Sequence, residues 1–97
     1  MNMKNLMAQA QKMQKDIQNI SNELENKEYS EDNGIIKLIM NGKREIIKFE
    51  INKQENFEDI ELLEDMIVTA FNKVLKNIEE EKERKLGKYT GGLGRLF

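Results

Sequence analysis

The sequence predicts an α+β fold in which two long helices accompany a small antiparallel β-sheet. Three patterns carry this prediction: apolar residues at alternating spacings of three and four near the N-terminus, a β-branched segment that ends in Asn-Gly, and a second helical stripe in the last third of the chain. A chain of 97 residues has room for one domain, which we place at residues 1–97. Because only 38% of the residues are apolar and 35% are charged, a second subunit would help to cover its apolar faces.

The first helix is expected from about Asn5 to Lys27, where no proline or glycine interrupts the chain. Its apolar positions form a heptad-type seam about three heptads long. The seam consists of Met3, Leu6, Ala10, Met13, Ile17, Ile20 and Leu24. Such a seam requires a partner helix, and we interpret its methionines as packing residues that fill irregular gaps.

The middle of the chain predicts a β-hairpin. The first strand is the β-branched segment Ile35–Met40, the turn is Asn41-Gly42, and the return strand is Glu45–Ile51. Asn-Gly is the strongest short-range hairpin signal, because both residues tolerate the positive φ of a type I′ turn. A two-residue turn of this kind would place Met40 opposite Lys43.

Both faces of this hairpin are partly apolar. One face, which the chain's own helices can cover, carries Ile36, Leu38, Ile47, Phe49 and Ile51. The other carries Ile35, Ile39 and Ile46 among Lys37, Arg44 and Lys48. We expect this second face, through its three isoleucines, to form the interface of a dimer. A short strand at Glu28–Glu31, turned back by Asp32-Asn33-Gly34, is expected to precede the hairpin.

The second helix is expected to start near Phe57. Five carboxylates crowd its first turns, at Glu58, Asp59, Glu61, Glu64 and Asp65. The helix macrodipole favours acids at that end, and the ordered ligand spacing of a calcium loop is missing, so we expect no metal site there. An apolar stripe that suits a sheet and a neighbouring helix follows at Leu63, Ile67, Ala70, Phe71, Val74, Leu75 and Ile78.

The end of the second helix changes character. Residues 79–85 include no apolar residue, so we expect them to stand in solvent as the tip of a helical arm. Gly87 is expected to end the helix, and the glycine-rich tail at 87–97 is expected to be flexible.

The composition argues against most kinds of enzyme. The chain has no cysteine and no histidine, which removes Ser-His and Cys-His catalysis and the usual zinc sites. We therefore expect a non-enzymatic protein without a metal, a cofactor or a small-molecule substrate. No apolar run approaches the roughly 18 residues that span a bilayer, and no secretory signal is present, so we expect a cytoplasmic protein without a membrane partner.

Four segments, in order, resemble the YbaB/EbfC family of bacterial nucleoid-associated proteins. Residues 5–14 (NLMAQAQKMQ) resemble the family's opening helix, and Met40-Asn41-Gly42 its hairpin. Residues 61–72 (ELLEDMIVTAFN) resemble the signature of its second helix, and Thr90–Gly94 with Leu96-Phe97 resembles its C-terminus. The ordered set spans essentially the whole chain. Three departures affect loops: Lys53 follows Asn52 without the usual proline, the turn at 32–34 is short, and the prolines usual near the C-terminus are missing.

The resemblance implies an α-β-β-β-α subunit and a homodimer whose joined sheets carry protruding helical arms. It also implies that the arms grip double-stranded DNA, that the protein is associated with the nucleoid, and that it influences chromosome organisation and gene expression.

The net charge of −2 argues mildly against nucleic acid, so an electrostatic case depends on local patches. If the two helices pack antiparallel, their basic residues come together on one arm, where they can contact DNA phosphates. This predicted DNA-binding set is Lys4, Lys12, Lys15, Lys82, Arg84, Lys85 and Lys88. The alternative is a helical-arm dimer that docks on another protein through its charged tips, as an adaptor without direct DNA binding.

Overall fold

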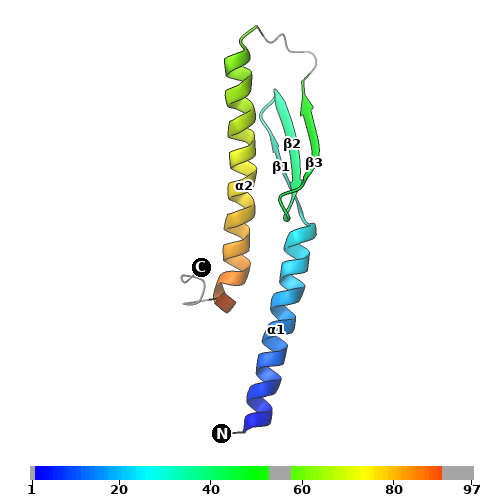
Figure 1. The fold of residues 1–97 in the computed structure, drawn as a ribbon, viewed down its shortest axis with the longest axis vertical. Coiled ribbons are helices and arrows are strands. Elements are labelled where there is room, and N and C mark those ends of the chain that lie inside the picture. Colours follow the sequence, from blue (N-terminus) through cyan, green and yellow to red (C-terminus); the bar gives the residue numbers. More distant parts are fainter. Residues whose placement is uncertain (1, 53–57, 91–97) are drawn as a thin grey trace.

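The computed structural model describes residues 2–52 and 58–90, which form two helices and a three-stranded sheet (Figure 1). The elements are α1 (Met3–Asn26), β1 (Glu28–Asp32), β2 (Ile36–Asn41), β3 (Ile46–Ile51) and α2 (Ile60–Thr90). The sheet is antiparallel with the strand order β1-β2-β3. The predicted fold class and the order of elements are confirmed, including the short first strand. The shape is elongated, at 70 × 23 × 15 Å, since α1 projects beyond the sheet.

The helix ends differ from the prediction by a few residues. α1 begins at Met3 because the Asn2 side chain accepts a hydrogen bond from the Lys4 N–H and caps the first turn. At the start of α2, the Asp59 carboxylate accepts from the Leu62 N–H in the same way. The predicted start near Phe57 lies outside the described residues. The prediction that Gly87 ends the second helix is wrong, because α2 continues to Thr90.

One face of the sheet is covered by α2, and the core lies between them. Tyr29, Leu38 and Met40 of the sheet pack against Val74 and Ile78 of α2, with Phe71 and Leu75 at the edge. The rings of Phe49 and Phe71 stack with their centroids 6.1 Å apart, which brings β3 against the same helix. Of the hairpin face predicted to lie under the chain's own helices, Leu38 and Phe49 pack against α2, whereas Ile47 is exposed.

The predicted two-residue hairpin turn is wrong. The Asn41 N–H donates to the Glu45 carbonyl and the Arg44 N–H donates to the Asn41 carbonyl, so the loop has three residues, of which Arg44 is left-handed at φ 66°. The Asn41 side chain organises this loop, since its oxygen accepts from the N–H groups of Lys43 and Glu45. A register shift follows, and Met40 pairs with Ile46 instead of lying opposite Lys43.

The hairpin loop requires glycine at position 42, but not for the positive φ that the sequence predicted, since Gly42 does not have one. A Cβ atom at this position would lie 1.8 Å from the Leu24 carbonyl oxygen and 3.0 Å from the Glu25 Cα. The Gly42 N–H donates to the Lys27 carbonyl at 3.1 Å. The hairpin loop therefore touches the backbone at the end of α1, which joins the helix firmly to the sheet.

Candidate nucleic-acid interface

The two helices pack antiparallel and form an arm that extends from the sheet (Figure 1). Their register is defined by Lys27, which forms an ion pair with Glu81, and by Ser21 and Leu86, which line a common pocket. Continuing this register places Thr90, the last described residue of α2, opposite Ile17. The first half of α1 therefore extends beyond the described part of α2, and Lys4 lies about 20 Å further along the helix axis than Ile17.

The three lysines of the α1 half of the predicted set share one side of the helix. At about 100° per residue, Lys4, Lys12 and Lys15 fall within about 80° of each other. Leu6 and Leu24, which belong to the apolar stripe, point in nearly the opposite direction. All three lysines are exposed and have no ion pair with any described residue. This side of the arm presents unneutralised positive charge to solvent.

The four cations of the α2 half have different surroundings. Arg84 and Lys85 each lie 3.9 Å from the carboxylate of Glu81. The Lys88 ammonium lies 5.0 Å from the centre of the Tyr89 ring. Lys82 is exposed and lines the pocket between the helices. The structure brings these four cations together on the last turns of α2, but it leaves the lysines of α1 on another side of the arm.

Glu81 is the residue that the sequence prediction missed. The prediction that residues 79–85 stand in solvent is wrong at this position, because Glu81 is buried. Its carboxylate accepts two hydrogen bonds from the Lys27 ammonium, at 2.6 and 2.8 Å. The hydrogen bonds from Lys27 hold the pKa of Glu81 below its ordinary value of 4.5, although burial opposes this. Glu81 follows Val74 and Ile78 at helical spacing, which was the signal available in the sequence.

Tyr29 completes this joint between the arm and the sheet. It is buried against Ile78 in the core, and the Lys27 ammonium lies 5.3 Å from the centre of its ring. Burial raises the pKa of the Tyr29 phenol to about 12, with a further contribution from the neighbouring Glu81 carboxylate. The phenol oxygen has no hydrogen-bond partner among the described residues. The joint is therefore held by one charged pair and by packing.

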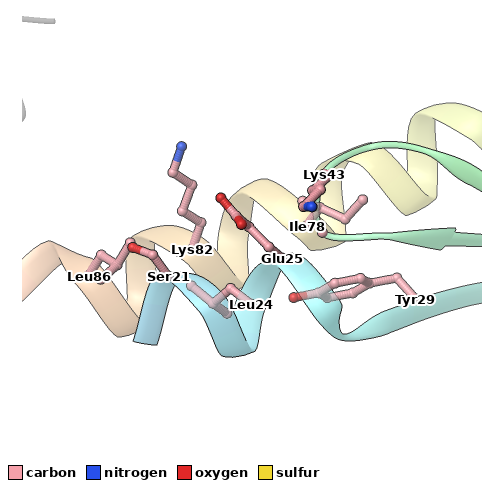
Figure 2. A pocket seen from close by; sticks show the side chains of 9 residues that line it. Ser21, Leu24, Glu25, Tyr29, Lys43, Ile78, Lys82 and Leu86 are labelled. Atoms are coloured by element: carbon pink, nitrogen blue, oxygen red, sulfur yellow. The ribbon is translucent and has the colours of Figure 1, made fainter. Parts of the chain in front are cut away.

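A pocket of about 200 Å³ lies where α1, α2 and the hairpin loop meet (Figure 2). It is lined by Ser21, Leu24, Glu25, Tyr29, Gly42, Lys43, Ile78, Lys82 and Leu86. Figure 2 shows Lys82 extending away from the helix and the Glu25 carboxylate on the same rim. The rim of the pocket therefore carries side chains of both charges, with Glu25 beside Lys43 and Lys82.

The residues predicted for the dimer interface lie on the sheet face away from α2 or at its edge. Ile39 is in the central strand and is half-buried, as is Ile35 just before that strand. Ile46, which pairs with Met40, begins the edge strand β3 and is exposed, as is Ile47 beside it. No described element covers this side of the sheet. An apolar surface is therefore available for a second subunit.

Two other expectations concern metal-binding sites and membrane-spanning helices. Among residues 2–52 and 58–90, no three acidic side chains are grouped so that they could hold a metal ion. In the same part of the chain, neither helix is long and apolar enough to cross a membrane.

The fold and the arm together define a structural class: an α-β-β-β-α chain whose two antiparallel helices extend from a small three-stranded sheet. The YbaB/EbfC DNA-binding family matches residues 1–93, and the chain belongs to this family.

Curated relatives cover nearly all of the chain. A nucleoid-associated protein of Clostridium kluyveri is 44% identical over 95 residues, which are 95% of this chain and 83% of the relative. A nucleoid-associated protein of Ruminiclostridium cellulolyticum is 43% identical over 98% of this chain and 85% of its own length. One from Hahella chejuensis is 39% identical over 96% and 88%. The resemblance identified from the sequence is confirmed.

A solved structure shares the fold. The crystal structure of the uncharacterized protein HP0035 from Helicobacter pylori matches with a TM-score of 0.70, over 94% of this chain and 99% of that one. At 19% identity, this likeness concerns the fold alone.

Proposed function

We propose that this chain is a nucleoid-associated protein that binds duplex DNA as a homodimer in the cytoplasm, and that it thereby influences chromosome organisation and gene expression. Family membership and the names of the relatives support DNA as the partner. In this proposal the protein is not an enzyme, and it binds mainly to phosphates, which give affinity without reading the bases.

One observation carries the proposed contact surface: the side of α1 that bears Lys4, Lys12 and Lys15 is basic and unpaired. Elsewhere in the described chain, many cations are neutralised by acids, as Lys73 is by Glu31 and Lys76 by Glu80. Neutralising phosphates releases counterions only if the protein's cations are not already paired. The α1 lysines therefore contribute most, and Lys82, Arg84, Lys85 and Lys88 contribute where α2 reaches the same duplex.

The homodimer rests on the open side of the sheet. The half-buried Ile35 and Ile39, and the exposed Ile46 of the edge strand, would be covered by a second copy. Two copies would also double the number of lysine-bearing arms, which raises affinity for a polyanion without any new kind of interaction.

The test is a matched pair of double variants. Lys12→Glu/Lys15→Glu reverses two unpaired charges on the arm. Lys73→Glu/Lys76→Glu makes the same change in charge, at the same spacing, on the part of α2 beside the sheet. Gel shifts with duplex DNA over a salt series should show a weaker affinity and a shallower salt dependence for the arm variant. The log-log slope should fall by about one unit for each phosphate that the variant no longer neutralises. The α2 variant should stay close to wild type.

Equal effects of the two variants would mean that binding follows the net charge and that the arm is not the contact surface. The second candidate, an adaptor that docks on another protein, is favoured by the net charge of −2 and by the ion pairs along α2. Wild-type protein without any salt-sensitive gel shift would support that candidate.

A further inference from the structure

The apolar seam of α1 is covered over only half of its length. Toward the sheet it lies beside α2, where Leu24 is buried and Ile17 and Ile20 are half-buried. Toward the N-terminus no described element covers it (Figure 1). The exposed fractions there are 72% for Met3, 44% for Leu6, 60% for Met7 and 49% for Met13. The seam therefore becomes exposed near Ile17, the level at which the described part of α2 ends. Residues 91–97, which belong to the predicted flexible tail, lie outside the described residues.

The exposed half of the seam is matched to the same half of a second copy. In an antiparallel pair of these helices, Met3 can lie level with Met13 of the second copy. Leu6 then lies level with Ala10 of the second copy, and both pairs recur with the copies exchanged. Every layer joins two apolar side chains, as in an antiparallel coiled coil, and the interface has two-fold symmetry.

The position of α2 favours the antiparallel direction. α2 lies on the seam side of α1 from the level of Ile17 toward the sheet. In a parallel pair, the α2 helices of both copies would have to occupy the same space between the two seams. In the antiparallel pair, Asn2 of the second copy lies level with Gln14, about 4.5 Å along the axis before Ile17. The described part of α2 and the α1 helix of the second copy therefore follow each other along one seam without overlapping.

The charges beside the seam also favour this pair. The three lysines of α1 point to the opposite side of the helix, so the two copies approach without repulsion between cations. Asp16, at the edge of the seam, forms no ion pair within the described residues. In the pair it lies within about 4.5 Å, measured along the axis, of Met3 of the second copy, where that helix begins. This helix end carries a partial positive charge and has no acid in its own first turn.

We propose that the exposed half of the α1 seam is a self-association surface through which two copies pair antiparallel at the ends of their arms. This surface is far from the side of the sheet proposed for the homodimer, so the pairing joins dimers into larger assemblies (Figure 1). Four large apolar side chains per copy form an interface smaller than the roughly 800 Å² per partner of stable complexes, so the pair is short-lived between free dimers. The lysine-bearing sides of both helices stay open.

The test is chemical cross-linking, which is selective because the chain contains no cysteine. Met7→Cys places a thiol beside the two-fold axis, about 3 Å along the axis from the same thiol of the second copy. Ala8→Cys is the matched control, since Ala8 is also exposed but lies on the opposite side of the helix. A short bismaleimide should link the full-length Met7→Cys chains into covalent pairs several times faster than the Ala8→Cys chains.

A further variant checks that the seam causes this difference. Adding Leu6→Gln and Met13→Gln to the Met7→Cys chain replaces two seam residues with a good helix former and should reduce linking to the rate of the control. Equal rates for Met7→Cys and Ala8→Cys, without these additions, would overturn the proposal and mean that the seam has another occupant.

A mixture of two variants tests the direction of the pair. In the antiparallel pair, position 3 is level with position 13 of the second copy, and each lies about 15 Å along the axis from its own counterpart. Met3→Cys and Met13→Cys chains should therefore link when mixed, whereas neither should link alone. Efficient linking of Met3→Cys chains to each other would indicate a parallel pair and contradict the proposal.

Light scattering of the linked Met7→Cys sample shows which copies pair. Dimers formed through the sheet should become assemblies of at least four chains. A linked product of two chains from an unlinked dimer would mean that the two arms of one dimer pair, which would overturn the proposal. If the unlinked protein is a monomer, a linked product of two chains supports the arm-end pair and contradicts the sheet interface. No DNA is present, so failure of the pairing leaves the proposed DNA binding untouched.

Discussion

The carboxylate of Glu81 sits in the joint where α1, β1 and α2 meet. It binds Lys27, which directly follows α1, and it lies 3.9 Å from the cations of Arg84 and Lys85 on its own helix. A buried carboxylate is costly unless it is paired, so the position of Lys27 is tied to that of α2. The direction in which the arm leaves the sheet depends on this pair together with the packing of Leu24 and Tyr29.

The first prediction concerns the pH dependence of this pair. Because the pKa of Glu81 is depressed in the folded state, its contribution to stability is present above the unfolded value of about 4.5 and is lost as the pH falls through the folded pKa. Glu81→Gln should lower the free energy of unfolding at neutral pH by about 1 kcal/mol, a modest value since Lys27 is half exposed. Urea unfolding should show that the difference from wild type shrinks well below pH 4.5. A difference that is the same at both pH values would contradict the assigned pKa shift.

The second prediction compares two glycines. Gly42→Ala places a methyl group against the Leu24 carbonyl and should destabilise the fold by about 2–3 kcal/mol, as other cases of overpacking do. Gly87→Ala is the matched control, since its added methyl meets no atom within 4 Å and the residue lies inside α2. It should stabilise the protein by about 0.5–1 kcal/mol through helix propensity. A urea midpoint of Gly42→Ala that is equal to or higher than that of the wild type would contradict the close approach at Gly42.

At the scale of elements, local patterns predicted more than interactions between distant residues. The spacing of apolar residues located both helices, and the asparagine and glycine turns located the strands, because these signals are contained within short segments. The hairpin register was wrong because it depends on where the loop meets α1 at Leu24, which lies 18 positions before Gly42. The burial of Glu81 depends on Lys27, and no local pattern in 79–85 identifies such a partner.

For the seven predicted DNA-binding residues, too, the sequence indicated the position of each side chain but not its neighbours in the fold. Sequence spacing placed Lys4, Lys12 and Lys15 off the apolar seam, and the structure agrees that they are exposed. The spacing did not indicate that Arg84 and Lys85 lie beside a buried acid. A candidate cation must therefore be judged by its neighbours as well as by its position on a helix.

The third prediction follows for the end of α2. Replacing Arg84 and Lys85 with glutamate puts two acids beside the buried Glu81 carboxylate. We expect the free energy of unfolding to fall by a few tenths to about 1 kcal/mol, because both side chains are largely exposed. Thermal or urea unfolding should show a lower free energy of unfolding for this variant, whereas Lys12→Glu/Lys15→Glu should unfold like the wild type. Equal stabilities would mean that Glu81 is satisfied by Lys27 alone.

At the scale of the whole molecule, one chain leaves too much apolar surface exposed for a protein with so thin a core. α2 covers one side of the sheet, and the other side carries Ile39 in the central strand. Strand β3 adds the exposed Ile46 and Ile47 at an edge of the sheet that pairs with no other described strand. A second copy that covers this surface would hold two arms at a fixed separation, which is the arrangement that binding to both sides of a duplex requires.

The last prediction links dimerisation to DNA binding. Ile39→Asp places a charge in the centre of the proposed interface, where burying it without a partner is costly. Light scattering should show the wild type at twice the mass of the chain and the variant at the mass of one chain. Circular dichroism should be unchanged, because Ile39 faces away from the core under α2.

The monomeric variant should bind DNA more weakly and with about half the log-log salt slope of the dimer, because it presents one lysine-bearing arm instead of two and the slope scales with the number of phosphates neutralised. Combining Ile39→Asp with Lys12→Glu/Lys15→Glu should remove most of the remaining salt dependence. If Ile39→Asp remains a dimer, the interface lies elsewhere, with the exposed strand β3 as the next surface to alter. If it is a monomer that retains the full slope, one arm is sufficient for binding and the role of the dimer is to connect two duplexes.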